Sequence, residues 1–288
     1  MKSRFTRLIL KSLGIHPDRR LPGFSRDNFV HWFSNRTKKT TNSNKVIYYH
    51  DTWVSFYYPE IGKAAVKLLE ALGLEVILLP QRVCCGRPML SKGLIEPARS
   101  RAKNNIELLS PYISRGIPII GTEPSCILTF RDEYPDLLPR NEDAKILAEN
   151  SYLLDEYLSK LDRTDSLNIF WKSNGPSVFF HGHCHQRALV GIETSIELLK
   201  MAGCSVTESR AGCCGMAGSF GYEKEHYNIS EEIGEDRLFP AVRDSTLDTV
   251  IAVTGVSCNQ QIEHFTGRKP RHVAEVLADQ IDGDKGSS

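Results

Sequence analysis

The sequence of 288 residues lacks long apolar segments and carries a formal net charge of only +1. No stretch approaches the roughly 18 consecutive apolar residues that a membrane-spanning helix needs. The short apolar run near the start is interrupted by Lys11, which argues against a secretory signal. Basic and aromatic residues form no interleaved stripe, so we expect no nucleic-acid partner. The composition, 41% hydrophobic and 25% charged, is that of an ordinary globular protein, and we expect a cytoplasmic location.

The eight cysteines carry most of the chemical information. Cytoplasmic thiols are kept reduced, which favours metal binding over disulfides. Seven of the eight occur in short loop-like motifs, whereas Cys204 follows a helical pattern and is expected to be a small buried hydrophobe. A redox disulfide between adjacent cysteines is disfavoured because the ring that it closes is strained.

The positive charge is concentrated at the start of the chain. Residues 1–44 contain ten Lys and Arg against two Asp, a formal charge of +8. This basic leader could dock on an acidic partner, or make a peripheral contact with the inner face of a membrane. A solvated linker is an equally good interpretation.

The chain contains an internal duplication centred on two Cys-Cys-Gly triplets, at residues 84–86 and 213–215. When the triplets are aligned, three flanking pairs of segments also match: residues 46–52 with 178–184, 64–73 with 195–203, and 119–126 with 251–258. The first and third pairs are typical of strands that end in polar or cysteine-containing loops, and the second of helices closed by glycine. The pattern predicts an α/β fold with two pseudo-symmetric halves, each a mainly parallel sheet flanked by helices.

This duplication divides the chain into five expected parts. They are a basic leader or linker (1–44), a first half (45–140), a connecting helix and linker (141–173), a second half (174–281) and a tail (282–288). Asn141 is expected to cap a helical pattern that extends through Leu158.

The second half contains four cysteines that follow predicted strands: Cys184, Cys213, Cys214 and Cys258. Loops beyond the carboxyl ends of parallel strands form a ligand crevice, so these sulfurs should converge. Four thiolates suit a four-iron, four-sulfur (4Fe-4S) cluster, and Gly215 and Gly218 let the backbone pass close to it. Zinc is the second interpretation, because adjacent cysteines match a zinc site poorly.

The first half contains three such cysteines: Cys84, Cys85 and Cys126. Asp51 and Thr52 take the place of the fourth. The pattern predicts a weaker second metal site, in which Asp51 or His50 would be an unusual ligand. The alternative is a half without metal that shapes a substrate or partner surface.

Three histidines, His181, His183 and His185, flank Cys184. Alternate residues near a strand end face different sides, so one or two of them at most could reach a common ion. Hydrogen bonds from these histidines to cluster sulfurs or to the backbone are favoured over ligation.

Four segments of the chain resemble the cysteine-rich (CCG) domain family. They are residues 13–22, 84–88, 181–186 and 212–221, which together span nearly the whole chain. The family occurs in one of the subunits of heterodisulfide reductases, in the iron–sulfur subunit of glycolate oxidase and in the C-terminal part of FAD-linked 2-hydroxyacid dehydrogenases. The segments most resemble the last group, which includes D-2-hydroxyglutarate and D-lactate dehydrogenases.

The resemblance implies an oxidoreductase component whose clusters pass electrons from a flavin to an acceptor, a quinone or a carrier. The sequence contains no flavin-binding domain and no ferredoxin-like run of four cysteines, so FAD is expected on a partner subunit or a missing domain. The chain would then be a split subunit or part of a fusion, inactive toward substrate alone. No extra cysteine shortly precedes Cys126 or Cys258, which argues against a noncubane cluster of the heterodisulfide reductase kind. The alternative function is a structural zinc or partner-docking module without redox activity.

Overall fold

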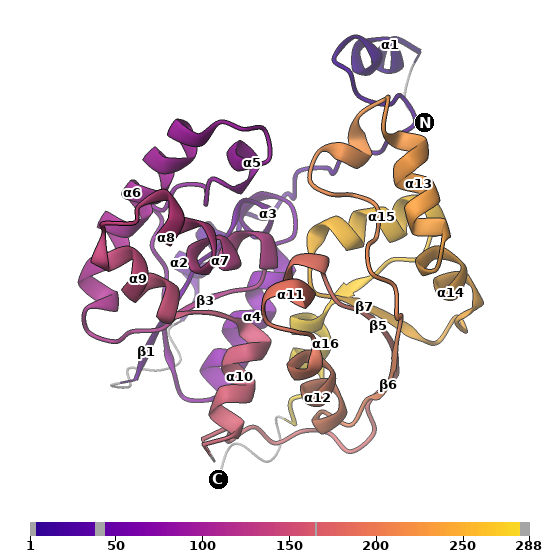
Figure 1. Cartoon of the computed structure of the whole chain (residues 1–288). Helices are drawn as coiled ribbons and strands as arrows, with labels where there is room; N and C mark the ends of the chain where they lie inside the picture. The colour runs from indigo at the N-terminus through magenta and orange to yellow at the C-terminus, as the bar shows by residue number, and fades with distance from the viewer. Residues whose placement is uncertain (1–3, 38–43, 165, 283–288) are drawn as a thin grey trace.

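The computed structural model describes residues 4–37, 44–164 and 166–282, so most of the expected tail (283–288) lies outside the described residues. Two similar α/β halves make up the chain (Figure 1). The first half holds a sheet with strand order β2-β1-β3-β4, and the second holds a sheet with order β6-β5-β7-β8. Every strand pair in both sheets is parallel. The predicted α/β fold with two repeated halves is confirmed.

The strands are short and occupy matching places in the two halves. They are β1 (Lys45–Tyr48), β2 (Glu75–Ile77), β3 (Ile119–Gly121) and β4 (Ser151–Leu153), then β5 (Ser177–His181), β6 (Ser205–Glu208), β7 (Val250–Val253) and β8 (Arg271–His272). The central strands are apolar and buried; Val46 and Phe180, for example, are fully enclosed. Burial of this kind is expected where helices cover both faces of a parallel sheet.

Helices connect the strands in both halves. The first half contains α3 (Thr52–Phe56), α4 (Pro59–Ala71), α5 (Arg87–Leu90), α6 (Ile95–Ile113), α7 (Pro124–Arg131), α8 (Glu133–Leu137), α9 (Glu142–Glu149) and α10 (Leu154–Asp162). The second contains α11 (Cys184–Leu189), α12 (Glu193–Met201), the short 3-10 helix η1 (Phe220–Tyr222), α13 (Tyr227–Glu235), α14 (Leu238–Asp244), α15 (Val256–Thr266) and α16 (Val273–Asp279). The two glycine-closed helices are confirmed, since Gly73 and Gly203 follow α4 and α12 with φ of 72° and 80°.

The helical pattern expected from Asn141 through Leu158 is interrupted by a strand. Asn141 does cap α9, because its Oδ1 accepts a hydrogen bond from the backbone N–H of Ala144 at 3.2 Å. Beyond α9, however, Ser151–Leu153 forms β4 and pairs with β3 before α10 begins. A three-residue strand between two helices is too short to have a recognisable period. The boundaries between the expected parts of the chain stay a prediction.

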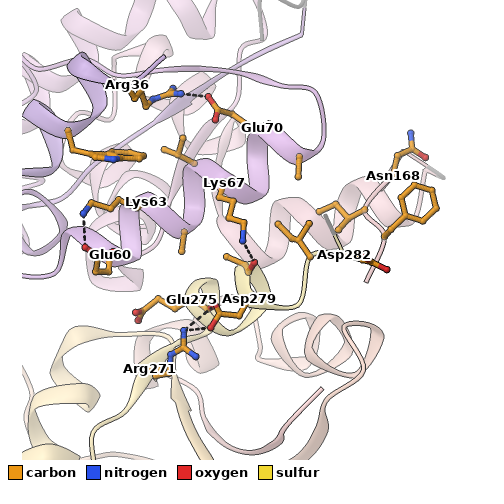
Figure 2. A pocket seen from close by; sticks show the side chains of 18 of the residues that line it. Arg36, Glu60, Lys63, Lys67, Glu70, Asn168, Arg271, Glu275, Asp279 and Asp282 are labelled. Carbon is orange, nitrogen blue, oxygen red and sulfur yellow. Dashed lines mark hydrogen bonds and ion pairs between the residues drawn. The ribbon is translucent and has the colours of Figure 1, made fainter. Parts of the chain in front are cut away.

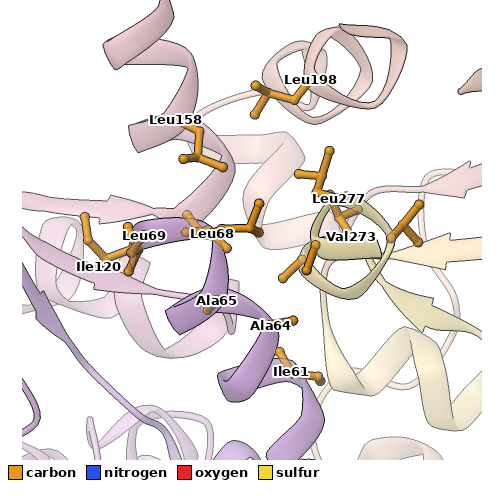
Figure 3. Packing of buried hydrophobic residues seen from close by; sticks show 14 of the residues in the cluster. Ile61, Ala64, Ala65, Leu68, Leu69, Ile120, Leu158, Leu198, Val273 and Leu277 are labelled. Atoms are coloured by element: carbon orange, nitrogen blue, oxygen red, sulfur yellow. The ribbon is translucent and has the colours of Figure 1, made fainter. Parts of the chain in front are cut away.

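One apolar cluster joins the two halves. Helix α4 of the first half packs on α16 of the second, and Figure 3 shows Ala64 and Leu68 facing Val273 and Leu277. All four side chains are nearly or fully buried. Lys67 adds a polar contact across this boundary by donating to the carbonyl oxygen of Ala278 at 2.7 Å. The halves therefore share a core.

The leader contributes two helices, α1 (Arg4–Ser12) and α2 (Phe29–Asn35). Helix α1 projects from the end of the second half near α13 (Figure 1). Helix α2 lies against α3 and α4, and Phe29 is fully buried there beside Tyr48. No helix in the described part of the chain combines the length and apolar character that a bilayer crossing requires.

Candidate metal centre

The four cysteines of the second half lie in turns that follow adjacent strands. Cys184 is the first residue of α11 after β5, Cys213 and Cys214 lie in the loop after β6, and Cys258 lies in the first turn of α15 after β7. Because β6, β5 and β7 are neighbours and parallel, these turns meet at one edge of the sheet.

Hydrogen bonds between thiol groups connect these four cysteines one after another. Cys184 contacts Cys213, Cys213 contacts Cys214, and Cys214 contacts Cys258. Cys184 is exposed, whereas Cys214 and Cys258 are buried. The thiols thus form a continuous set that runs from the surface into the interior.

The surroundings of this set favour two thiolates. Hydrogen bonds from Cys184 and Cys214 lower the pKa of Cys213, and the backbone N–H of Gly215 helps, at 3.3 Å from its Sγ. A hydrogen bond from Cys214 and the nearby His181 lower the pKa of Cys258. The donating thiols of Cys184 and Cys214 have raised pKa values for the same reason. Thiolates are the form that binds metals.

The four sulfurs are not arranged as a preformed zinc site. A tetrahedral zinc ion with thiolates at 2.3 Å holds its sulfurs about 3.8 Å apart. Among the described residues, two groups of three or more possible ligand atoms lie within 4.8 Å of one another: Asp132, Glu133 and His185, and Glu223, Glu225 and His226. Neither contains a cysteine. Consecutive thiols of the set contact each other, but no three of them lie mutually within 4.8 Å.

Glycine is required at the end of the second triplet. Gly215 has φ of 89°, and a Cβ there would lie 2.1 Å from the carbonyl oxygen of Ser230. Gly218 also has a positive φ, of 66°, but open space around it. The loop therefore turns tightly beside the sulfurs, as expected from its glycines.

The three histidines occupy different places. His181 is fully buried, with Nδ1 2.9 Å from the hydroxyl of Ser209, and faces the cysteines. His183 caps α11 by accepting a hydrogen bond from the backbone N–H of His185. Burial and the nearby Arg87 lower the pKa of His185 to about 4. His181 and His183 both lie close enough to Cys258 to lower its pKa, and the backbone of His185 hydrogen-bonds to Cys184.

The three cysteines of the first half also converge. Cys84 and Cys85 lie between β2 and α5, and Cys126 lies in the first turn of α7 after β3. Hydrogen bonds connect Cys84 to Cys85 and Cys85 to Cys126. Thr52 begins α3 at the place where Cys184 begins α11, so the fourth thiol has no counterpart.

The first-half thiols lie in an acidic setting. Asp51 is buried and caps α3 through Oδ1, which accepts from the backbone N–H groups of Trp53 and Val54. Burial and the neighbouring Glu123 raise the pKa of Asp51 to about 6. The hydrogen bond from Cys85 lowers the pKa of Cys126, but burial and both carboxyl groups outweigh it and raise the pKa to about 11.

Two polar contacts join the half-sites. The Glu123 carboxylate accepts from the backbone N–H of Val256 at the start of α15, at 2.9 Å. The Ser125 hydroxyl lies 3.4 Å from Nε2 of His183. Because Cys126 follows Ser125 and Cys184 follows His183, these contacts bring the two sets of cysteines toward the same boundary between the halves.

Several residues near the cysteines were missed by sequence reasoning. Arg19 is almost fully buried and contacts Met216 and Gln261, which follow Cys214 and Cys258 by two and three residues. Arg19 belongs to residues 13–22, one of the segments that carry the family resemblance. Nothing in the sequence indicated that its side chain lies beside the cysteines. The sequence distinguished Glu123 only as the residue before Pro124, and its contact with Val256 could not be predicted.

A large cavity lies away from the cysteines. It occupies about 750 Å³ between α4 and α16 (Figure 2). Two ion pairs lie in its lining, Arg36 with Glu70 and Arg271 with Asp279. None of the described residues that line it is a cysteine or a histidine. The cavity is therefore no part of the candidate metal centre.

Comparison with known families gives two matches in this chain. The model of the cysteine-rich domain family matches residues 47–131 and again residues 178–263. Each matched segment takes in most of the first three strands of one sheet but not the fourth, and together they contain all seven motif cysteines.

Three curated relatives illustrate the range of proteins to which the chain is similar. One subunit of the anaerobic glycerol-3-phosphate dehydrogenase of Escherichia coli is 32% identical over 95% of this chain and 69% of the relative. D-2-hydroxyglutarate dehydrogenase from the same organism is 28% identical over 82% of this chain but 22% of its own length. Lactate utilization protein A from Bacillus subtilis is 29% identical over 78% of this chain and 94% of the relative.

Proposed function

Because this chain belongs to the cysteine-rich domain family, we propose that it is the iron–sulfur electron-transfer component of a FAD-linked 2-hydroxyacid dehydrogenase or a related enzyme. It would pass electrons from a flavin on a partner subunit or domain to a quinone or a carrier. The observation that supports the proposal is the series of contacts between thiol groups, from Cys184 through Cys213 and Cys214 to Cys258, at one edge of a parallel sheet.

We propose that these four cysteines hold a 4Fe-4S cluster, which supplies one-electron transfer when bound. The chain's own residues would do three things. The four thiolates bind the iron, the Gly215 N–H and His181 stabilise negative charge on sulfur, and the apolar cluster that contains Cys214 and Cys258 keeps water away from the buried side. Exposed Cys184 gives the centre one side open to partners.

For the first half we propose a weaker second site formed by Cys84, Cys85 and Cys126. The thiols are in contact, which supports metal binding. The buried carboxyl group of Asp51 and the absence of a fourth thiol in this described set both argue for lower affinity.

The names of the relatives suggest the kind of reaction that the partner performs. Glycerol 3-phosphate, 2-hydroxyglutarate and lactate each carry a secondary hydroxyl group. We propose that the flavin partner oxidises a small anionic molecule of this kind.

Redox cycling tests the proposed function directly. The anaerobically reconstituted chain is mixed with photoreduced FMN and then with menadione, and its visible absorbance is followed. We expect bleaching by the flavin and recovery with the quinone. A chain that retains zinc and shows no redox-active absorbance would support the rival function, a structural or partner-docking module.

A contact with an anionic membrane surface is proposed for α1. Arg7 and Lys11 share the helix with Leu8 and Ile9, which are 67% and 43% exposed, and Leu13 beyond the helix is 68% exposed. An amphipathic basic helix of this kind binds at the lipid interface. Sedimentation with phosphatidylglycerol vesicles should exceed that with phosphatidylcholine vesicles, and the double variant Arg7→Glu with Lys11→Glu should abolish the difference. Equal sedimentation with both vesicles would contradict the contact.

A further inference from the structure

A segment of the leader pairs with the chain that follows the second cysteine loop. The backbone N–H of His16 donates to the carbonyl oxygen of Tyr222 at 2.8 Å, and that of Lys224 donates to Gly14 at 2.9 Å. The His16 ring stacks on Tyr227, with ring centres 3.8 Å apart. The leader is therefore anchored beside the candidate metal centre, in spite of its distance in sequence.

This anchored segment brings Arg19 into the interior. The Arg19 side chain is 1% exposed and is among the largest fully buried side chains of the protein. Its guanidinium group lies over the rings of Tyr222 and Phe265, at 5.0 and 5.4 Å from their centres. Arginine keeps its proton in proteins, so a fixed positive charge lies inside the second half.

The hydrogen bonds of Arg19 lead directly to the cysteine-bearing segments. Nη2 donates to the sulfur of Met216 at 3.2 Å and to Oε1 of Gln261. Met216 belongs to the loop of Cys213 and Cys214, and Gln261 lies one turn after Cys258 on α15. Arg19 thus contacts two of the three segments that carry the thiols.

Gln261 is held in the orientation that Arg19 needs. Its Nε2 donates to the carbonyl oxygen and to the hydroxyl of Ser230, at 3.1 and 2.8 Å. The other end of the amide, Oε1, is then the end that faces Arg19. The same carbonyl group of Ser230 closes the space beside Gly215. The guanidinium, the amide and the tight turn of the cysteine loop form one packed unit.

We propose that Arg19 is a positioning residue of the second-half centre, which places a fixed positive charge behind the Cys213-Cys214 loop and thereby raises the reduction potential of the centre. The inference rests on the proposed function. Reduction adds one electron, and hence one negative charge, to a group held by four thiolates. A buried cation nearby stabilises that added charge with little screening by solvent. Net charge and neighbouring groups are known determinants of cluster potentials.

Dye-mediated redox titration of the reconstituted protein tests this inference. Three variants are compared with the wild type: Arg19→Met, which removes the charge but keeps the length; Arg19→Lys, which keeps the charge; and Arg20→Met, which removes the neighbouring exposed charge. We expect Arg19→Met to shift the midpoint potential by ~59 mV or more toward negative values. For a one-electron centre at a fixed potential, this shift is a tenfold or greater rise in the ratio of oxidised to reduced centre. Arg19→Lys should shift less, and Arg20→Met should match the wild type.

The outcomes separate the inference from the proposed function. A wild type that holds no iron and sulfide overturns the proposed function itself. An Arg19→Met protein that is fully loaded and keeps the wild-type midpoint, or an equal shift in Arg20→Met, overturns the inference alone. Where Arg19→Met fails to load, Arg19→Gln, which is also neutral but can still form hydrogen bonds, is titrated instead. A midpoint shifted in the negative direction supports the role of Arg19, and a loaded Arg19→Gln protein with the wild-type midpoint contradicts it.

Discussion

The two halves share a topology but surround their cysteines differently. Both sheets have the same strand order, and both place a Cys-Cys-Gly turn and a helix-borne cysteine at the carboxyl edge. In the second half a buried histidine and a backbone N–H favour thiolates, and in the first half two carboxyl groups oppose them. The duplicated scaffold therefore provides the position of the sulfurs, and we expect the neighbouring side chains to determine how readily each set binds metal.

The caps of the corresponding helices show the same divergence. Asp51 caps α3, whereas His183 caps α11. The next residue is Thr52 in one half and Cys184 in the other. A single turn thus differs both in charge and in the presence of a fourth thiol.

The largest expected effect comes from equivalent cysteine substitutions in the two halves. Cys214→Ser should remove most of the bound iron, because it deletes a buried proposed ligand that contacts two other thiols. Cys85→Ser should leave the second-half centre in place. We expect the first change to weaken iron retention by more than the roughly 10–100-fold typical of losing a supporting residue. Iron and sulfide content of both reconstituted variants is the measurement, and equal losses would erase the distinction between the halves.

The next effect concerns the glycines of the two triplets. Gly86 and Gly215 have φ of 93° and 89°, so alanine at either position costs about 1–2 kcal/mol in backbone strain. At Gly215 the added Cβ would also lie 2.1 Å from a backbone oxygen, whereas at Gly86 the nearest atom is 3.4 Å away. Urea unfolding of the metal-free proteins should show Gly215→Ala to be less stable than Gly86→Ala by about 2 kcal/mol. A larger loss at Gly86 would contradict this geometry.

The acidic setting of the first half predicts a pH dependence. The pKa of Asp51 is raised to about 6 in the folded state, by burial and then by Glu123, against about 3.9 in an unfolded chain. The folded state therefore holds the extra proton, and stability from this group is full below about pH 4 and is lost as the pH rises through 6. Asp51→Asn keeps the cap but has no charge to gain.

The measurement is urea unfolding of both metal-free proteins between pH 4 and pH 7. Relative to Asp51→Asn, the wild type should lose on the order of 2–3 kcal/mol over this range, since one pKa unit corresponds to about 1.4 kcal/mol. Taking the difference between the two proteins removes the opposite contribution of His50, whose pKa burial lowers to about 4. A difference that stays constant with pH would show that Asp51 is charged in both states.

The smallest effect is expected for the cysteine that belongs to neither site. Cys204 is 6% exposed within the apolar core, as the sequence predicted. Cys204→Ala should leave the iron and sulfide content unchanged and lower the free energy of unfolding by about 1 kcal/mol. A marked loss of iron would show that the grouping of the cysteines is wrong.

The repeat made much of the fold predictable. Apolar runs, glycine-closed helices and the cysteine positions recur in both halves, so each half supports the interpretation of the other. Because parallel strands end at a common edge, the convergence of Cys184, Cys213, Cys214 and Cys258 followed from their places after strands. Strand β4 could not be predicted, because a strand of three residues between two helical patterns is too short to show a period.

The supporting residues could not be predicted because their partners are distant in the chain. Arg19 contacts Gln261, and the Glu123 carboxylate accepts from the N–H of Val256. Neither pair has a spacing that sequence reasoning can recognise. The leader was expected to lie outside the repeat as a linker or docking segment, yet residues 14–19 pack against the second half. Contacts of this kind depend on how the halves and the leader pack together.

Quantifying iron, zinc and acid-labile sulfide in the anaerobically reconstituted wild-type chain tests the central claim most directly. We predict iron and sulfide in equal amounts, about four of each per cluster, with absorbance that reduction bleaches and oxidation restores. Stoichiometric zinc without sulfide would contradict the claim, because the four thiols of the second half would then hold a single structural ion and carry no electrons.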